Sequence, residues 1–135
     1  MTAKSSPPAL SVSILSSQLV RTTHRCDVVW QLENQGPDQI ELEESWLPHG
    51  QFRASREAFV PPLILSAGDA VLHHRTVELV VAPGGLVENA FLILRALYTE
   101  DTWRIFVRMN IEVAPDGTVR PIVEAVTASP VQEEA

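Results

Sequence analysis

The segment Trp103–Val113 reads WRIFVRMNIEV, and apolar and polar residues alternate along nearly all of it. The apolar row comprises Trp103, Ile105, Val107, Met109, Ile111 and Val113, and the positions between them are polar except for Phe106. Successive side chains of a β-strand point to opposite faces, so this pattern predicts a long strand with one buried face and one solvent-exposed face. We expect the remaining segments to be strands that cover the buried row.

The whole chain has 135 residues, a formal net charge of −7 and 45% hydrophobic residues. This size predicts a single domain over residues 9–128, between a flexible leader at 1–8 and a disordered tail at 129–135. The acidic charge argues against binding to nucleic acid or to a membrane surface. The chain has one cysteine, no continuous apolar signal segment and no spanning run of about 18 apolar residues. We therefore expect a cytoplasmic protein, or else one exported by a signal that this sequence does not include.

Alternation predicts further strands, and turn residues separate them. They cover residues 10–14, 25–33, 40–43, 71–81, 86–98 and 119–127. A change of phase around Leu15 to Val20 predicts a β-bulge or a break in the first strand. Pro121 predicts that the last strand lies at a sheet edge, because proline cannot donate a backbone hydrogen bond to a ladder.

Two hairpins follow from these strands. The turn residues at 34–38 predict that Trp30 and Leu32 pack against Ile40 and Leu42 on adjacent strands. A four-residue turn at 99–102 predicts that Tyr98 pairs with Trp103, Ala96 with Ile105, Leu94 with Val107 and Leu92 with Met109.

Residues 45–69 contain several prolines and glycines and are predicted to be mostly irregular. A helical turn at 53–59 and short strands at 59–60 and 63–65 are the regular structure that we expect there. The predicted fold class is therefore an all-β, two-sheet antiparallel β-sandwich of seven to nine strands, immunoglobulin-like in topology.

The stretch Val28–Gly36, VVWQLENQG, together with Pro61-Pro62 before a Gly68-Asp69 turn, resembles bacterial immunoglobulin-like accessory and adhesion domains. The resemblance implies a β-sandwich that works as a binding or scaffolding module. It implies no particular ligand and carries no functional residue over to this chain.

The predicted hairpin of residues 86–98 and 103–113 leaves an outward row rich in aromatic and arginine residues. Its members are Phe91, Ile93, Arg95, Leu97, Arg104, Phe106 and Arg108. The predicted register places Leu97 beside Arg104, Arg95 beside Phe106 and Ile93 beside Arg108. Aromatic residues and arginine are enriched in protein interfaces, so this patch predicts contact with a protein partner or with a second copy of the chain. The alternative is that residues 45–69 or a terminal segment cover the patch and make it ordinary core.

Metal sites have weaker support. The carboxylates of Glu33, Asp38, Glu41, Glu43 and Glu44 could attract a divalent cation or a basic partner, but their spacing fits no EF-hand loop and some lie on the exposed face of a strand. His73 and His74, with Glu78, could bind zinc, but neighbours on a strand point to opposite faces. We therefore predict no metal site and no cofactor.

Catalytic features are similarly weak. Cys26 belongs to an inward row, where a buried thiol is not activated as a nucleophile. Residues 83–85 lack the lysine of a phosphate-binding loop, and no serine occupies a nucleophile elbow. We predict a non-enzymatic protein-interaction module, either self-associating or an accessory subunit. The alternative is a small-ligand or carbohydrate-binding module that uses Trp46 and the segment 45–69.

Overall fold

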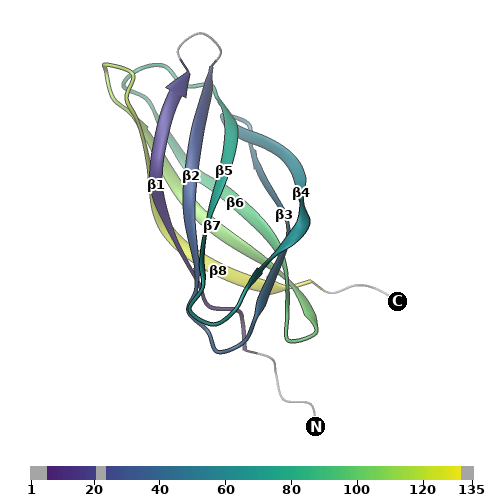
Figure 1. The fold of residues 1–135 in the computed structure, drawn as a ribbon. Helices are drawn as coiled ribbons and strands as arrows, with labels where there is room; N and C mark the ends of the chain where they lie inside the picture. The colour runs from purple at the N-terminus through teal and green to yellow at the C-terminus, as the bar shows by residue number, and fades with distance from the viewer. Residues whose placement is uncertain (1–5, 21–23, 132–135) are drawn as a thin grey trace.

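The computed structural model describes residues 6–20 and 24–131, and each regular element in this part of the chain is a β-strand (Figure 1). The strands are β1 Leu10–Val20, β2 Arg25–Asn34, β3 Ile40–His49, β4 Phe52–Leu65, β5 Ala70–Leu79, β6 Leu86–Tyr98, β7 Asp101–Val113 and β8 Val119–Pro130. All paired neighbours are antiparallel, which confirms the predicted all-β antiparallel fold. Among the described residues, no helix has the length and hydrophobicity needed to cross a membrane.

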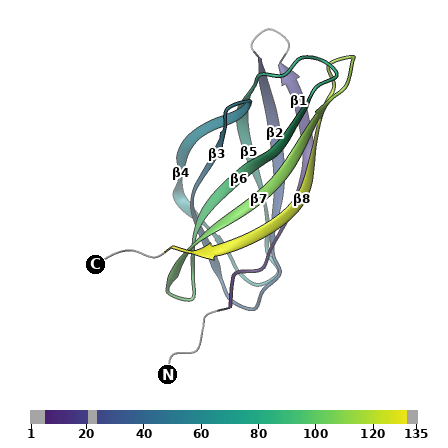
Figure 2. The same cartoon turned by 180° about the vertical axis from the view of Figure 1, so that it is seen from behind.

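The strands form one eight-stranded sheet in the order β1-β2-β5-β4-β3-β6-β7-β8. The sheet curls around one interior until its end strands approach each other (Figures 1 and 2). There Ser17 Oγ of β1 donates a hydrogen bond of 2.9 Å to Val119 O of β8. The predicted division into two sheets is not confirmed, because β3 pairs with both β4 and β6 and so joins the strands into one nearly closed, barrel-like sheet.

The interior is filled by the apolar rows that the sequence predicts. On β7 the buried residues are Trp103, Ile105, Val107, Met109, Ile111 and Val113. On β6 they include Ala90, Leu92, Leu94, Ala96 and Tyr98. Both predicted inward faces are therefore confirmed, and each contributes to one contiguous core.

The predicted register of the β6–β7 hairpin is wrong by two residues. Tyr98 pairs with Asp101 and Ala96 pairs with Trp103. The connection is a two-residue turn in which Thr99 and Glu100 both have positive φ, 46° and 72°. Positive φ at both central residues is the geometry of a type I′ hairpin turn, which matches the twist of the flanking strands. Because the shift is two residues, every side chain stays on its predicted face.

The predicted pairing of residues 25–33 with the strand after the 34–38 turn is also wrong. In the sheet β2 lies between β1 and β5, whereas β3 lies between β4 and β6. The buried Asn34 side chain holds the connection that carries the chain past β5 and β4 to β3. Its Nδ2 donates to Asp38 O at 2.8 Å and to Leu65 O at 3.0 Å, which ties the connection to the end of β4. Trp30, Leu32, Ile40 and Leu42 are nevertheless all buried, as predicted.

Residues 45–69 are mostly regular, contrary to prediction. β3 continues to His49, and after a turn β4 pairs with it from Phe52 to Leu65, so the predicted helical turn at 53–59 is strand. Two irregularities in register, between Leu42 and Glu44 and between Ser45 and Leu47, interrupt the alternation. These irregularities hide the strand from a search for strict period-two patterns.

Three local predictions concern the first and last strands. The bulge in β1 is confirmed, since its register shifts between Ile14 and Ser16. Pro121 lies in β8, which ends the strand order as predicted. β8 extends to Pro130, beyond the predicted start of the tail at 129. Within the predicted leader Pro8 is buried, while residues 1–5, and residues 132–135 of the tail, lie outside the described residues.

The positive φ angles of the β6–β7 turn give a test of the observed register. A residue other than glycine or asparagine at such an angle costs about 1–2 kcal/mol. We expect Thr99→Asn combined with Glu100→Gly to raise the free energy of unfolding by about 1 kcal/mol, measured by urea denaturation. Glu112→Gly, at an extended position of β7, is the control and should lower that free energy. A loss of stability in the turn variant would contradict the two-residue turn.

Candidate functional site

The seven residues of the predicted patch all lie on β6 and β7, on the side of the sheet opposite to the core rows. We call this set the outer face: Phe91, Ile93, Arg95, Leu97, Arg104, Phe106 and Arg108. The observed register puts Ile93 opposite Phe106, Arg95 opposite Arg104 and Phe91 opposite Arg108. The predicted pairs of the outer face are therefore diagonal neighbours, and the patch remains contiguous.

The apolar members of the outer face pack against each other on the solvent side of the sheet. The rings of Phe91 and Phe106 meet edge to face, with centroids 6.3 Å apart and an interplanar angle of 89°. Ile93 retains only 9% of its exposed area although it points away from the core, whereas Leu97 retains 37%. The segment 45–69 forms strands within the sheet beside β6, so it does not lie over the outer face.

Trp46 and Arg56 extend this patch across β3 to β4. The sequence prediction placed Trp46 in a candidate ligand-binding loop instead, and it did not single out Arg56. Trp46 pairs with Ile93, which places its half-buried side chain next to the outer face. The Arg56 guanidinium carbon lies 4.1 Å from the centroid of the Trp46 ring, a cation–π contact. Had residues 45–49 been recognised as a strand, the alternation of its side chains would have placed Trp46 on the outer side of the sheet.

Charges on the patch are unevenly paired. Arg95 Nε lies 3.5 Å from Glu43 Oε1, and Arg56 Nε lies 3.2 Å from Glu44 Oε2. Arg108 Nη1 donates a long hydrogen bond of 3.5 Å to Asn89 Oδ1. Arg104 is exposed and has no ion pair with the residues that the structure describes. Two of the five predicted acidic residues thus neutralise arginines, and the exposed charge of β7 remains available.

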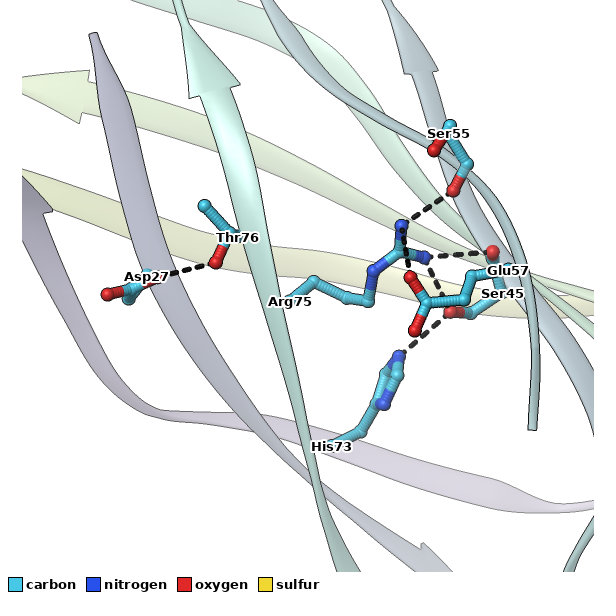
Figure 3. Close-up of polar contacts among 7 residues, drawn as sticks. All are labelled: Asp27, Ser45, Ser55, Glu57, His73, Arg75 and Thr76. Atoms are coloured by element: carbon cyan, nitrogen blue, oxygen red, sulfur yellow. Dashed lines mark hydrogen bonds and ion pairs between the residues drawn. The ribbon is translucent and has the colours of Figure 1, made fainter. Parts of the chain in front are cut away.

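A second group of functional interest is buried where β4 separates from β5 (Figure 3). β4 and β5 pair only at Phe52–Leu79 and Arg53–Glu78. Farther along, the Arg75 side chain spans the gap. Arg75 is 6% exposed and donates to Ser45 O at 2.9 Å, to Ser45 Oγ at 2.9 Å and to Ser55 O at 2.6 Å. Its guanidinium group therefore links β5 to β3 and β4 where backbone hydrogen bonds between β4 and β5 are missing.

His73 completes this buried group. Its Nε2 lies 2.9 Å from Ser45 Oγ, and its ring packs against Phe59, with centroids 4.8 Å apart. Burial, together with the nearby Arg75 and His74 charges, lowers the pKa of His73 to about 4. The ring is therefore neutral near pH 7, and an unprotonated Nε2 can accept a hydrogen bond from the Ser45 hydroxyl.

The Ser45–His73 contact has the separation of a nucleophile and its general base. Ser45, however, is 1% exposed, and its hydroxyl oxygen already accepts a hydrogen bond from Arg75. A substrate has no access to this oxygen in the observed conformation. We therefore regard the contact as structural, a polar link that joins β3, β4 and β5.

The remaining candidate residues lie as the face assignments predict. Cys26 is fully buried, and burial raises its pKa to about 11, so its thiol is protonated near neutral pH. His73 points inward, whereas His74 is exposed and lies 3.3 Å from Asp27 Oδ1. Within residues 6–20 and 24–131, no group of three or more histidine, cysteine or acidic side chains could hold a metal ion.

Surface depressions also lie away from the outer face, and two of them have several charged lining residues. One of about 640 Å³ lies between the connection after β5 and the β7–β8 turn, and Glu112, Asp116 and Arg120 are its charged lining residues. Another of about 300 Å³ lies beside Arg75, where Glu57, His74 and Thr76 contribute to the lining. The hydroxyl of Thr76 already donates to Asp27. Neither depression combines an accessible nucleophile with a positioned base.

The buried His73 predicts a pH dependence of stability. Its pKa falls from 6.5 to about 4 on folding, so the unfolded chain binds more protons between these values. Stability should be fully present above pH 6.5 and should fall by up to about 3 kcal/mol as the pH decreases to 4. We expect His73→Gln to flatten this part of the curve of unfolding free energy against pH. His24→Gln, which changes an exposed ring outside this buried group, is the control and should leave this part of the curve in place.

Comparison with known proteins adds no family to this description. No protein-family model matches the chain, and no curated protein is similar enough in sequence to count as a relative.

Proposed function

We propose that this chain is a non-enzymatic protein-interaction module that contacts another protein molecule through its outer face. The contacted molecule is either a second copy of the chain or a protein that the chain serves as an accessory subunit. The observation that carries this proposal is the packed apolar cluster of Phe91, Ile93 and Phe106 on the solvent side of strands whose other side already forms the core.

The composition of the patch supports a protein partner over other ligands. Aromatic residues and arginine dominate the energetics of protein interfaces, because they combine large apolar area with directional polar contacts. The outer face has three arginines on a molecule whose formal net charge is −7, and Trp46 and Arg56 continue it. A partner with apolar and acidic side chains would complement this surface.

The alternative of a carbohydrate or small-ligand site in the segment 45–69 has less support. It depends on an accessible Trp46 ring in an open loop. That segment consists largely of paired strands, and the Arg56 guanidinium covers one face of the Trp46 ring. An interface role accounts for the same two residues without requiring a pocket.

We also propose an immunoglobulin-like relationship for the fold, supported by strand order. Followed around the sheet, β1-β2-β5-β4 and then β3-β6-β7 repeats the order of the ABED and CFG strands of an immunoglobulin domain, with β8 added. The short contact between β4 and β5, limited to two residue pairs, is where a two-sheet sandwich would divide. The cytoplasmic location remains a prediction from the sequence.

Photocrosslinking tests the interaction proposal directly. We expect Phe106→p-benzoylphenylalanine to form a covalent adduct with a protein when irradiated in the cells that make this chain. The reason is that the ring at this position would lie inside the contact. Adducts are identified by mass spectrometry, and the crosslink is then repeated with the two purified proteins.

The control places the same photoreactive residue at Leu72, an exposed apolar position on β5 that is 56% exposed and lies away from the outer face. We expect few or no adducts from this site. If neither variant forms adducts, or if both form the same ones, the outer face is not a specific contact surface.

A further inference from the structure

The surface formed by β3 and the outer face is acidic along β3 and basic along β7. β3 presents Glu41, Glu43 and Glu44, whereas β7 presents Arg104 and Arg108. The register shifts between Leu42 and Glu44, so two successive residues, Glu43 and Glu44, lie between inward-pointing neighbours. Their contacts with Arg95 and Arg56 place both glutamates on the outer surface. β6 lies between these columns, so β3 and β7 are about 10 Å apart.

Two rows cross these strands in matching order. One row runs from Glu44 through Arg95 to Arg104, and the next runs from Trp46 through Ile93 to Phe106. The first row therefore runs from an acidic residue on β3 to a basic residue on β7, and the second row has an aromatic residue at each end. This order resembles the self-complementary pattern of an isologous interface, in which residue i contacts residue j of the other copy and j contacts i.

We propose that two copies of this chain associate face to face about a two-fold axis. The axis is parallel to β6 and passes between the two outer faces near Ile93. This inference rests on the proposed function and specifies its partner as a second copy. Such an axis places β3 of one copy over β7 of the other. Glu44 then meets Arg104 of the second copy, and Trp46 meets Phe106 of the second copy, each pair occurring twice.

The charges of β3 and β7 favour this arrangement over a shifted one. Arg104 is exposed and lacks an ion pair among the described residues, so a carboxylate from outside would supply its missing partner. The Glu44 side chain keeps 28% of its exposed area for such a contact, although its Oε2, which lies 3.2 Å from Arg56, is itself buried. At the axis, Arg95 would face Arg95 of the second copy. The carboxylate of Glu43, whose Oε1 lies 3.5 Å from Arg95 Nε, reduces the repulsion between these two arginines. The apolar row with Ile93 at its centre would supply the buried area.

A charge-reversal experiment tests the axis. We expect the wild-type chain to dimerise in analytical ultracentrifugation, and Arg104→Glu and Glu44→Arg each to weaken dimerisation at least about tenfold, because each places like charges in both contacts. Arg120→Glu carries the same charge change on β8 outside the contact, and should dimerise like the wild type. Urea denaturation of each variant separates loss of association from loss of folding.

Mixing the two weakened variants is the decisive step. In a mixed dimer, Glu44 of one copy meets the native Arg104 of the other, and the introduced glutamate meets the introduced arginine. We expect native mass spectrometry of the mixture to show heterodimers at close to wild-type affinity. Failure to recover association would overturn the axis, as would a wild-type chain that stays monomeric. If Phe106 crosslinks only to a different protein, the dimer is wrong while the proposed function stands; if no adduct forms, both fail.

Discussion

The structure depends on one constraint, that eight antiparallel strands turn their apolar rows toward a single interior. The period of two in a β-strand fixes which side chains can enter that interior. β6 and β7 satisfy the constraint along their whole length, with residues such as Leu92, Leu94, Val107 and Met109 fully buried. Their opposite faces are then committed to the outside, where Phe91, Ile93 and Phe106 form a second apolar cluster. This outward apolar cluster is not needed for the core, and it is the candidate interface.

The interior also contains a buried polar group that links strands where the sheet is weakly paired. Where β4 leaves β5, hydrogen bonds from Arg75 to Ser45 and Ser55 join β5 to β3 and β4. A buried guanidinium group is costly to desolvate, and its cost is offset here by several hydrogen bonds of good length. An inward-pointing charge also discourages another strand from pairing with the free edge of β5. The same side chain therefore links these strands and protects an edge.

Proline limits the other free edges of the sheet. Pro61 and Pro62 lie in the part of β4 that has separated from β5, and Pro121 lies in the terminal strand β8. Because proline has no N–H to donate, these positions make poor templates for strand addition. Association through a sheet face, as proposed, is consistent with edges that are blunted in this way.

The sequence by itself determined which face each strong strand buries, since alternation is a local property. It therefore predicted the core rows of β2, β6 and β7, the bulge at Leu15, the edge position of Pro121 and the seven residues of the outer face. Extension of the inward parity of Val77 and Leu79 toward the start of β5 would also have indicated that Arg75 and His73 point inward. Only the tertiary structure decided which strands are neighbours. Strand order, the two-residue β6–β7 turn, and the contacts of Trp46 with Arg56 depend on turn geometry and on residues distant in sequence, which a period-two pattern does not encode.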